Sequence, residues 1–251
     1  MSSPDLLLLS GAAASIAFVH TLLGPDHYLP FVAMAKARGW SRARTLRVTL
    51  LCGIGHLVGS VALGLVGIAF GAQLARLEWI EAVRGETAAW LLVGFGLAYA
   101  AWGLRRAWRK QPHAHWHAHG ALVHHHAHGH AGSHAHLHDD AHEPAVAGEV
   151  REGGAATGSL TPWIIFVIFV LGPCEPLIPL LMYPAATHSV AGVLWVTAVF
   201  GVVTVVTMLL AVTLCTAGLG KLSFGRFARY DHAMAGFAVL ACGLAITVFG
   251  L

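Results

Sequence analysis

The segment FVHTLLGPDHYL, residues 18–29, interrupts what would otherwise be the first long hydrophobic helix of the chain. At its centre a Gly-Pro pair, Gly24 and Pro25, is surrounded by two histidines and an aspartate. A Gly-Pro pair frees backbone carbonyls that lipid cannot satisfy, so such a break has to lie in the protein interior or line a cavity. The segment therefore predicts a polar site inside a hydrophobic bundle.

The composition is that of a membrane protein. Of the 251 residues 57% are apolar and only 11% charged, with a mean hydropathy of +0.68, whereas a soluble domain has about 25% charged residues. Apolar runs of about 20 residues, the length that crosses a hydrocarbon core about 30 Å thick, separate the charged clusters. We expect an all-α membrane protein with six transmembrane helices, near 6–23, 46–70, 86–107, 161–183, 190–217 and 231–251.

The basic residues predict the orientation of these helices. Thirteen of the fifteen lysines and arginines fall in the first, third and fifth connections, and cytoplasmic connections carry such an excess. We therefore expect a multi-pass protein of the cell inner (plasma) membrane with both termini outside the cytoplasm and the long third connection inside it. The formal net charge of +3 reflects this bias and does not indicate a nucleic-acid partner.

The two halves of the sequence resemble each other. Shifted by 148 positions, FVHTLLGPDHYL lies over FVIFVLGPCEPL (166–177), so that Gly172 and Pro173 repeat the first break. GIGHLV (53–58) lies over GVVTVV (201–206), and GLAYAAWGL (96–104) over GLAITVFGL (243–251) after removal of one residue. Three helices per repeat is an odd number, which predicts a 3+3 inverted repeat with a broken first helix in each half. The units expected are a first repeat at 1–107, a cytoplasmic His-rich loop and linker at 108–160, and a second repeat at 161–251.

The first break carries candidate metal ligands. Pro25 suits the first position of a new half-helix, which would place Asp26 and His27 in its opening turn. His20 lies seven residues before His27, about 10 Å along a continuous helix, which is too far for one metal ion. Either the break brings the two rings together, or they belong to successive sites along a path.

The second break offers different donors at the equivalent positions, namely Cys174 and Glu175 in place of Asp26 and His27. A carboxylate inside a membrane costs about 3 kcal/mol by insertion scales, so Asp26 and Glu175 are candidates for function. The alternative is that each carboxylate caps a half-helix or neutralises a histidine.

His56 lies in GIGHLVGS, in the middle of the second predicted span, among three glycines (Gly53, Gly55 and Gly59) that would let a neighbouring helix approach closely. Its alternative role is an interhelical hydrogen bond. Imidazole, carboxylate and a thiol suit Co²⁺, Ni²⁺, Cu²⁺ or Zn²⁺ and not Mg²⁺ or Ca²⁺, which prefer all-oxygen shells. The metal would be cargo, with no tightly bound cofactor and no enzymatic reaction.

A low-complexity loop at 113–143 holds thirteen of the eighteen histidines. Its His-x-His alternation lets an extended chain present imidazoles on one side, and such a tract can bind several divalent ions without a defined fold. The alternative is a pH-responsive or solvating loop. The loop ligands expected are His113, His115, His117, His119, His124, His125, His126, His128, His130, His134, His136, His138 and His142.

These motifs resemble a known family. HTLLGPDHYLPFVAMA (20–35) resembles the H-x(5)-D-H signature of the HupE/UreJ-type nickel permeases, within the nickel/cobalt transporter (NicO) superfamily, and GIGHLVGS resembles the later Gly-His motif of that superfamily. The resemblance implies that His20, Asp26, His27 and His56 are metal ligands on a transport path for Ni²⁺ or Co²⁺. The larger nickel/cobalt permeases have one residue fewer between His and Asp, and typically eight helices.

Other functions compete with metal transport. LGPCEP (171–176) is similar to segments of sulfite-exporter-like proteins and of membrane thiol–disulfide carriers, but such a carrier needs two cysteines that can meet, and the repeat places Asp26 opposite Cys174. A metal sensor without transport is a further alternative. The partners expected are divalent metal ions and the lipid bilayer, while a homo-oligomer and a cytosolic metallochaperone are also compatible.

Overall fold

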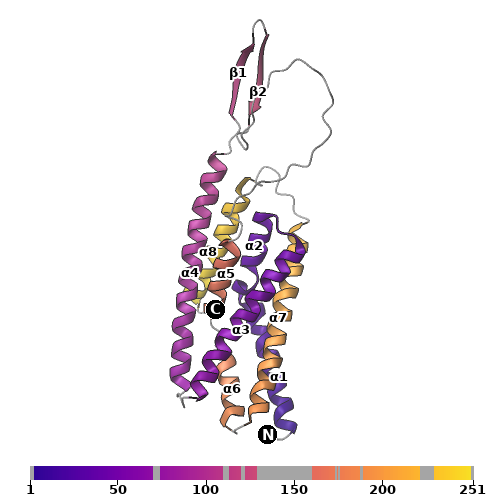
Figure 1. The fold of residues 1–251 in the computed structure, drawn as a ribbon, viewed down its shortest axis with the longest axis vertical. Coiled ribbons are helices and arrows are strands. Elements are labelled where there is room, and N and C mark those ends of the chain that lie inside the picture. Colours follow the sequence, from indigo (N-terminus) through magenta and orange to yellow (C-terminus); the bar gives the residue numbers. More distant parts are fainter. Residues whose placement is uncertain are drawn as a thin grey trace.

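The computed structural model describes residues 3–69, 74–109, 113–119, 122–128, 160–172, 174, 176–186, 189–220 and 229–249. The body of the molecule is an elongated bundle of helices (Figure 1). Within the described residues, five helices are long and apolar enough to cross a membrane, at Asp5–Leu23, Arg42–Val66, Arg76–Arg109, Val190–Leu219 and Asp231–Phe249. Many large apolar side chains on the bundle are exposed, such as Leu7 (78%) and Leu214 (71%), as expected of a surface that faces lipid.

The first half contains a broken helix followed by two long ones. Helix α1 ends directly before Gly24, a single 3₁₀ turn (η1) follows, and α2 then continues in the same general direction (Figure 1). The bounds are α1 Ser3–Leu23, η1 Pro25–His27, α2 Leu29–Arg38, α3 Arg42–Ala69 and α4 Leu74–Arg109. Pro25 therefore begins a helical turn as the sequence predicts, but this turn is 3₁₀ and α2 begins only at Leu29.

The second half has the same order of elements. Two short helices flank the LGPCEP segment, and at roughly 18 and 15 Å each is too short to cross a membrane alone. The bounds are α5 Leu160–Leu171, α6 Leu177–Ala186, α7 Val190–Gly220 and α8 Asp231–Phe249. The predicted span at 161–183 is thus a pair of helices with a break between them.

Helix α4 is longer than the sequence predicts. The third span was expected to begin near residue 86, with the charges of 76–86 in a connection, whereas α4 begins at Leu74 and runs for 36 residues. Glu81 is completely buried. The prediction was wrong because two of these charges, Glu81 and Arg84, have partners inside the bundle, described below.

The described part of the His-rich loop forms two antiparallel strands, β1 (His113–His119) and β2 (Leu122–His128), which lie apart from the bundle (Figure 1). His115 is paired with His126, and His117 with His124. The extended backbone agrees with the prediction, but the pairing of two strands was not anticipated. The bundle itself is all-helical as predicted, and the loop histidines beyond residue 128 lie outside the described residues.

The ends of the helices that carry most of the basic residues lie together. The end of α2, the start of α3, the end of α4 and the start of α8 all lie at the end of the bundle that faces the hairpin, whereas the N-terminus lies at the other (Figure 1). The core between these ends is divided among several apolar clusters, one around Phe31 and Met208 and another around Leu181 and Phe200.

Candidate metal centre

Three histidines meet inside the bundle. His20 comes from the last turn of α1, His27 from η1, and His56 from the middle of α3, where it is the fifteenth of 28 residues. The ring centroids of His20 and His27 are 5.0 Å apart, and those of His27 and His56 are 5.4 Å apart. One ring nitrogen from each residue lies within 4.8 Å of those of the other two. Among the described residues this is the group of side chains that could hold a metal ion.

The break in the first helix produces this convergence. The amide of Gly24 still bonds to the carbonyl of His20 at 3.0 Å and closes α1, and the amide of His27 then bonds to Gly24 at 3.1 Å to form the 3₁₀ turn. The interruption of the α-helix by this turn places the rings of His20 and His27 side by side. Of the two arrangements that the sequence allowed, the structure has the one in which both belong to a single centre.

Gly24 is required sterically at this turn. A methyl group placed on its Cα would lie 2.6 Å from Nδ1 of His27 and 2.9 Å from Oδ1 of Asp26. Both distances are shorter than van der Waals contact, so any larger residue would displace the histidine ring. The glycine therefore allows the backbone to pass directly beside a ligand.

Two of the rings are oriented by acceptors on their Nδ1 atoms. Nδ1 of His56 lies 3.3 Å from the carbonyl oxygen of Phe169, and Nδ1 of His27 lies 3.2 Å from the carbonyl oxygen of Gly24. A carbonyl oxygen only accepts, so each Nδ1 carries the proton and donates, which leaves Nε2 with its lone pair. Bonds of this kind orient the imidazoles of metal sites.

The Nε2 atoms are the ones without partners. Nε2 of His20, of His27 and of His56 are all buried and form no hydrogen bond. A buried polar atom that forms no hydrogen bond costs about 1–3 kcal/mol, so three in one place require an explanation. Three neighbouring imidazoles, each with a buried ring nitrogen that forms no hydrogen bond, are available to bind a transition-metal cation.

Asp26 lies beside the three rings and not among the closest donors. Its Oδ1 is 3.3 Å from Nδ1 of His27, and its side chain is 23% exposed. It lines a cavity of about 40 Å³ together with the three histidines, and small residues of α4, Ala88 and Ala89, form one wall. In this geometry the carboxylate supports His27 and makes the cavity attractive to a cation.

The glycines around His56 allow close packing, as the sequence predicts. A methyl group on Gly55 would lie 2.8 Å from the side chain of Val170, and one on Gly59 would lie 2.8 Å from its carbonyl oxygen. Helix α5 therefore packs closely against α3. This contact brings the carbonyl of Phe169 to His56.

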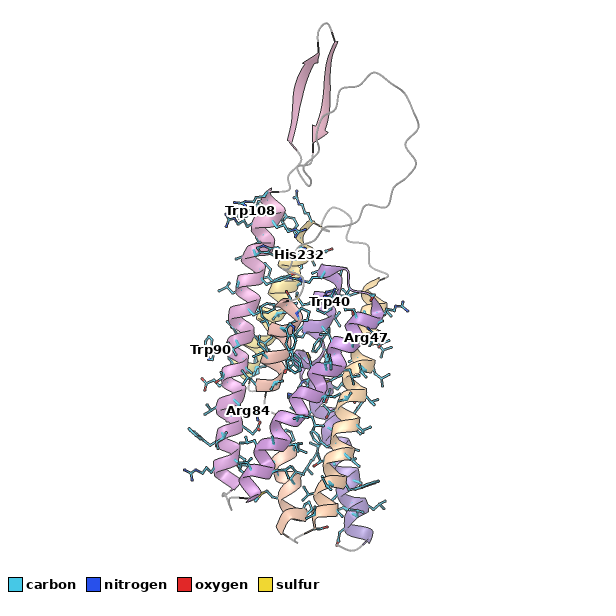
Figure 2. All side chains as sticks on the ribbon, in the orientation of Figure 1. Trp40, Arg47, Arg84, Trp90, Trp108 and His232 are labelled. Carbon is cyan, nitrogen blue, oxygen red and sulfur yellow. The ribbon has the colours of Figure 1, made fainter. Side chains whose placement is uncertain are left out.

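The ion pair of Glu81 and Arg84 on α4 was not recognised in the sequence as part of the site. Arg84 forms a hydrogen-bonded ion pair with Glu81 and points from α4 into the bundle (Figure 2). Its Nη2 also donates to the carbonyls of Val170 (2.9 Å) and Gly172 (3.3 Å) at the end of α5. Oε2 of Glu81 accepts from the amide of Cys174 at 3.2 Å. The ion pair therefore provides hydrogen-bonding partners for backbone groups on both sides of the second break. Lipid could not provide such partners. The signal in the sequence was the i,i+3 spacing of opposite charges beside an apolar run.

The donors predicted at the second break lie elsewhere or outside the described residues. Cys174 is completely buried, but it is not in the group formed by the three histidines. Pro173 and Glu175 lie outside the described residues. A role for Cys174 or Glu175 as a ligand stays a prediction.

The centre has to be interpreted from its own chemistry, because the chain matches no protein-family model, no curated protein and no solved structure. Imidazole nitrogens bind Zn²⁺, Cu²⁺, Fe²⁺ and Ni²⁺, and they disfavour Mg²⁺ and Ca²⁺. Three neutral imidazoles with one nearby carboxylate leave a divalent ion with one net positive charge. Such a site can bind a transition metal without neutralising it completely.

Proposed function

We propose that this protein is a secondary transporter that carries a divalent transition metal, Ni²⁺ or Co²⁺, across the membrane through the centre formed by His20, His27 and His56. The observation that carries the proposal is the grouping of three histidines beside a broken helix, each with a buried Nε2 that forms no hydrogen bond. Ionisable groups within a membrane bundle mark ion pathways. Discontinuous helices at mid-bundle are the usual place for the substrate site of secondary transporters.

The geometry is close to that of a bound ion. Nitrogens that each lie about 2.1 Å from one tetrahedral metal ion are about 3.4 Å apart. The observed separations are within 4.8 Å, so rotations that move the ring nitrogens by about 1 Å would complete three ligands. A site that needs small rotations to close on its ion can also release it.

Contacts between the halves support the proposed inverted repeat of six spans. Gly96 of α4 lies against the backbone of Leu240 on α8, and Gly243 of α8 lies against the backbone of Val93 on α4. At a shift of 147 positions, Gly96 corresponds to Gly243 and Val93 to Leu240. The two contacts are therefore the same contact made twice, as a pseudo-two-fold axis between the halves requires.

A second reciprocal contact relates α3 and α7. Gly53 lies against the side chain of Val205, and Gly201 lies against the side chain of Leu57. At a shift of 148 positions, Gly53 corresponds to Gly201 and Leu57 to Val205. The packing of whole helices follows the same rule, because α1 packs on α7 as α5 packs on α3.

The orientation proposed has both termini outside the cytoplasm. The basic ends of α2, α3 and α4 lie on the side of the His-rich hairpin (Figure 1), and basic residues favour the cytoplasmic face. The hairpin would then meet cytosolic metal before or after it crosses the membrane. We propose that it captures or buffers metal, since His-rich tracts bind divalent ions.

The competing functions lack a comparable observation. The four cysteines are free, and Cys52 and Cys174 belong to different apolar clusters, whereas a thiol–disulfide carrier needs a pair. An exporter of sulfite or another small anion would find three imidazole lone pairs and a carboxylate at mid-bundle, which repel an anion. A metal sensor would use the same centre but would show no flux.

The test is metal flux into vesicles that contain the purified protein, measured separately for Ni²⁺, Co²⁺, Zn²⁺ and Cu²⁺. We expect His27→Ala to abolish flux, because it removes one ligand and the partner of Asp26. Deletion of 113–143 should weaken flux or change its metal threshold without abolishing it. The matched control is His232→Ala on α8, which removes a histidine outside the centre.

Each outcome separates the functions. Normal flux in His27→Ala would refute the site. Metal binding that depends on His27 without flux would identify a sensor, and sulfite flux without metal flux would identify an anion exporter.

A further inference from the structure

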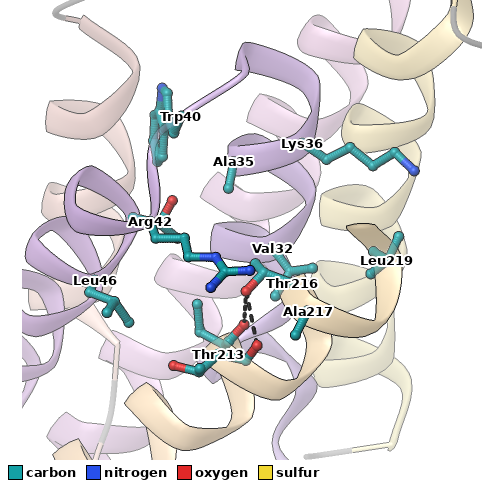
Figure 3. Close-up of a pocket in the computed structure, with 12 residues that line it drawn as sticks. Val32, Ala35, Lys36, Trp40, Arg42, Leu46, Thr213, Thr216, Ala217 and Leu219 are labelled. Atoms are coloured by element: carbon teal, nitrogen blue, oxygen red, sulfur yellow. Dashed lines mark hydrogen bonds between the residues drawn. The ribbon is translucent and has the colours of Figure 1, made fainter. Parts of the chain in front are cut away.

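A large pocket lies away from the histidine centre, at the basic end of the bundle. It has a volume of about 410 Å³ and is enclosed by α2, α3 and α7, within the range of about 300–1,000 Å³ typical of ligand sites. The guanidinium group of Arg42 extends into it beside Thr213 and Thr216 (Figure 3). Lys36 and Trp40 line it as well.

The charge around this pocket is positive without an acidic counterpart on the elements that form it. The sequence has no aspartate or glutamate between residues 27 and 77, or between 176 and 230. These intervals include α2, α3 and α7. In the same region five basic residues occur within twelve positions, namely Lys36, Arg38, Arg42, Arg44 and Arg47. The pocket is therefore suited to an anion.

An apolar groove continues from the pocket along the bundle. It has a volume of about 330 Å³ and shares Leu46 and Thr213 with the pocket. Its other walls are apolar side chains of α3 and α7, including Leu50 (38% exposed), Val206 (47%) and Leu210 (57%). Arg47 stands at its rim and lies near the basic end of α3 (Figure 2).

We propose that the pocket and groove together bind one anionic phospholipid. Its headgroup phosphate would lie in the pocket beside Arg42, and an acyl chain would lie in the groove between α3 and α7. Basic pockets between transmembrane helices on the cytoplasmic side are suited to anionic headgroups. This assignment does not depend on metal transport.

A lipid fits this surface better than a soluble anion does, for two reasons. The groove exposes leucine and valine on the side of the bundle that faces hydrocarbon, where a soluble anion would leave them uncovered. The pocket also contains a tryptophan, Trp40, with the guanidinium of Arg44 5.3 Å from its ring. Tryptophan is enriched at the level of lipid headgroups.

The test is a lipid titration of the full-length protein in detergent, followed by native mass spectrometry. Phosphatidylglycerol and phosphatidylcholine with identical acyl chains are compared. We expect tighter binding of phosphatidylglycerol, and a loss of about fivefold in affinity in Arg42→Gln, because one basic residue contributes about that factor. Leu210→Ala should weaken binding of the same lipid by about fourfold, because the half-exposed leucine loses contact with the acyl chain equal to about one buried methylene group.

Two matched variants serve as controls. Arg105→Gln removes an exposed arginine of α4 at the same end, and Leu214→Ala removes an exposed leucine one turn further along α7; both should bind phosphatidylglycerol normally. Equal losses in Arg105→Gln and Arg42→Gln would overturn the site, as would equal binding of the two lipids by the unmodified protein. Displacement of phosphatidylglycerol by excess inorganic phosphate, with no effect of Leu210→Ala, would replace the lipid with a soluble anion.

Discussion

Replacement of Arg84 by glutamine is expected to destabilise the bundle strongly. The side chain of Arg84 is 18% exposed and that of Glu81 is completely buried, so the variant leaves a buried carboxylate without its cation. Breaking a buried ion pair from one side costs about 3–5 kcal/mol. The carbonyls of Val170 and Gly172 also lose a charged donor. Since proteins of this size unfold with about 5–15 kcal/mol, the loss would be a large fraction of the total.

The cost should fall when the other charge is removed as well. The double variant Glu81→Gln with Arg84→Gln has no isolated charge, and the side-chain amide oxygen introduced at position 81 could still accept from the backbone amide of Cys174. We expect the double variant to recover about 2 kcal/mol relative to Arg84→Gln alone, which is within the range of coupling energies for contacting residues.

The assay is equilibrium unfolding in detergent micelles, with metal binding measured on the folded fraction. The control is Arg76→Gln, an exposed arginine of the same helix, which should change stability by less than about 0.5 kcal/mol. Metal affinity should fall in Arg84→Gln, because the end of α5 that Arg84 secures also carries the carbonyl that orients His56. A loss of stability below about 1 kcal/mol, or a double variant no better than the single one, would refute the argument.

Two glycine substitutions test the close contacts, each with a glycine control that has no neighbour within 4 Å. Gly24→Ala should lower metal affinity by about 10–100-fold, the usual effect of disturbing the surroundings of a ligand, because the added methyl group displaces His27. The control, Gly11→Ala, should bind metal normally. Equal affinities of the two variants in equilibrium dialysis would contradict the site geometry. Gly96→Ala should destabilise the bundle by about 1–3 kcal/mol through overpacking against α8. Gly94→Ala should leave the free energy of unfolding unchanged or raise it by up to about 1 kcal/mol through helix propensity. An equal change in the free energy of unfolding in both variants would show that α4 and α8 are not packed as described.

The sequence was sufficient to locate the first break and the histidines beside it. Hydrophobic runs set the length of the helices, and a Gly-Pro pair ends a helix wherever it occurs, so both signals act locally. His20, His27 and His56 could be selected because histidine is rare inside membrane spans. The distances among them could not be predicted, because they depend on the direction the chain takes after Gly24 and on the position of α3.

Two charged residues, Glu81 and Arg84, lie inside the bundle and not in a connection as predicted. The sequence predicts these residues in a connection between helices, because no residue near them in the chain could compensate for the cost of burying a charge. Their partners, the carbonyls of Val170 and Gly172 and the amide of Cys174, are about ninety positions away. Cys174 was selected because of its position in the repeat, but the contact of its backbone amide with Glu81 is a property of packing.

The sequence by itself determined that the chain forms apolar helices, where the first helix breaks, and which side chains could bind a transition metal. Those properties depend on neighbours along the chain. Only the tertiary structure decided that the three imidazoles form one centre, that an ion pair on α4 holds the second break, and that a basic pocket continues into an apolar groove. Each of these joins residues that are distant in sequence, and their approach depends on how the helices pack, which no local pattern specifies.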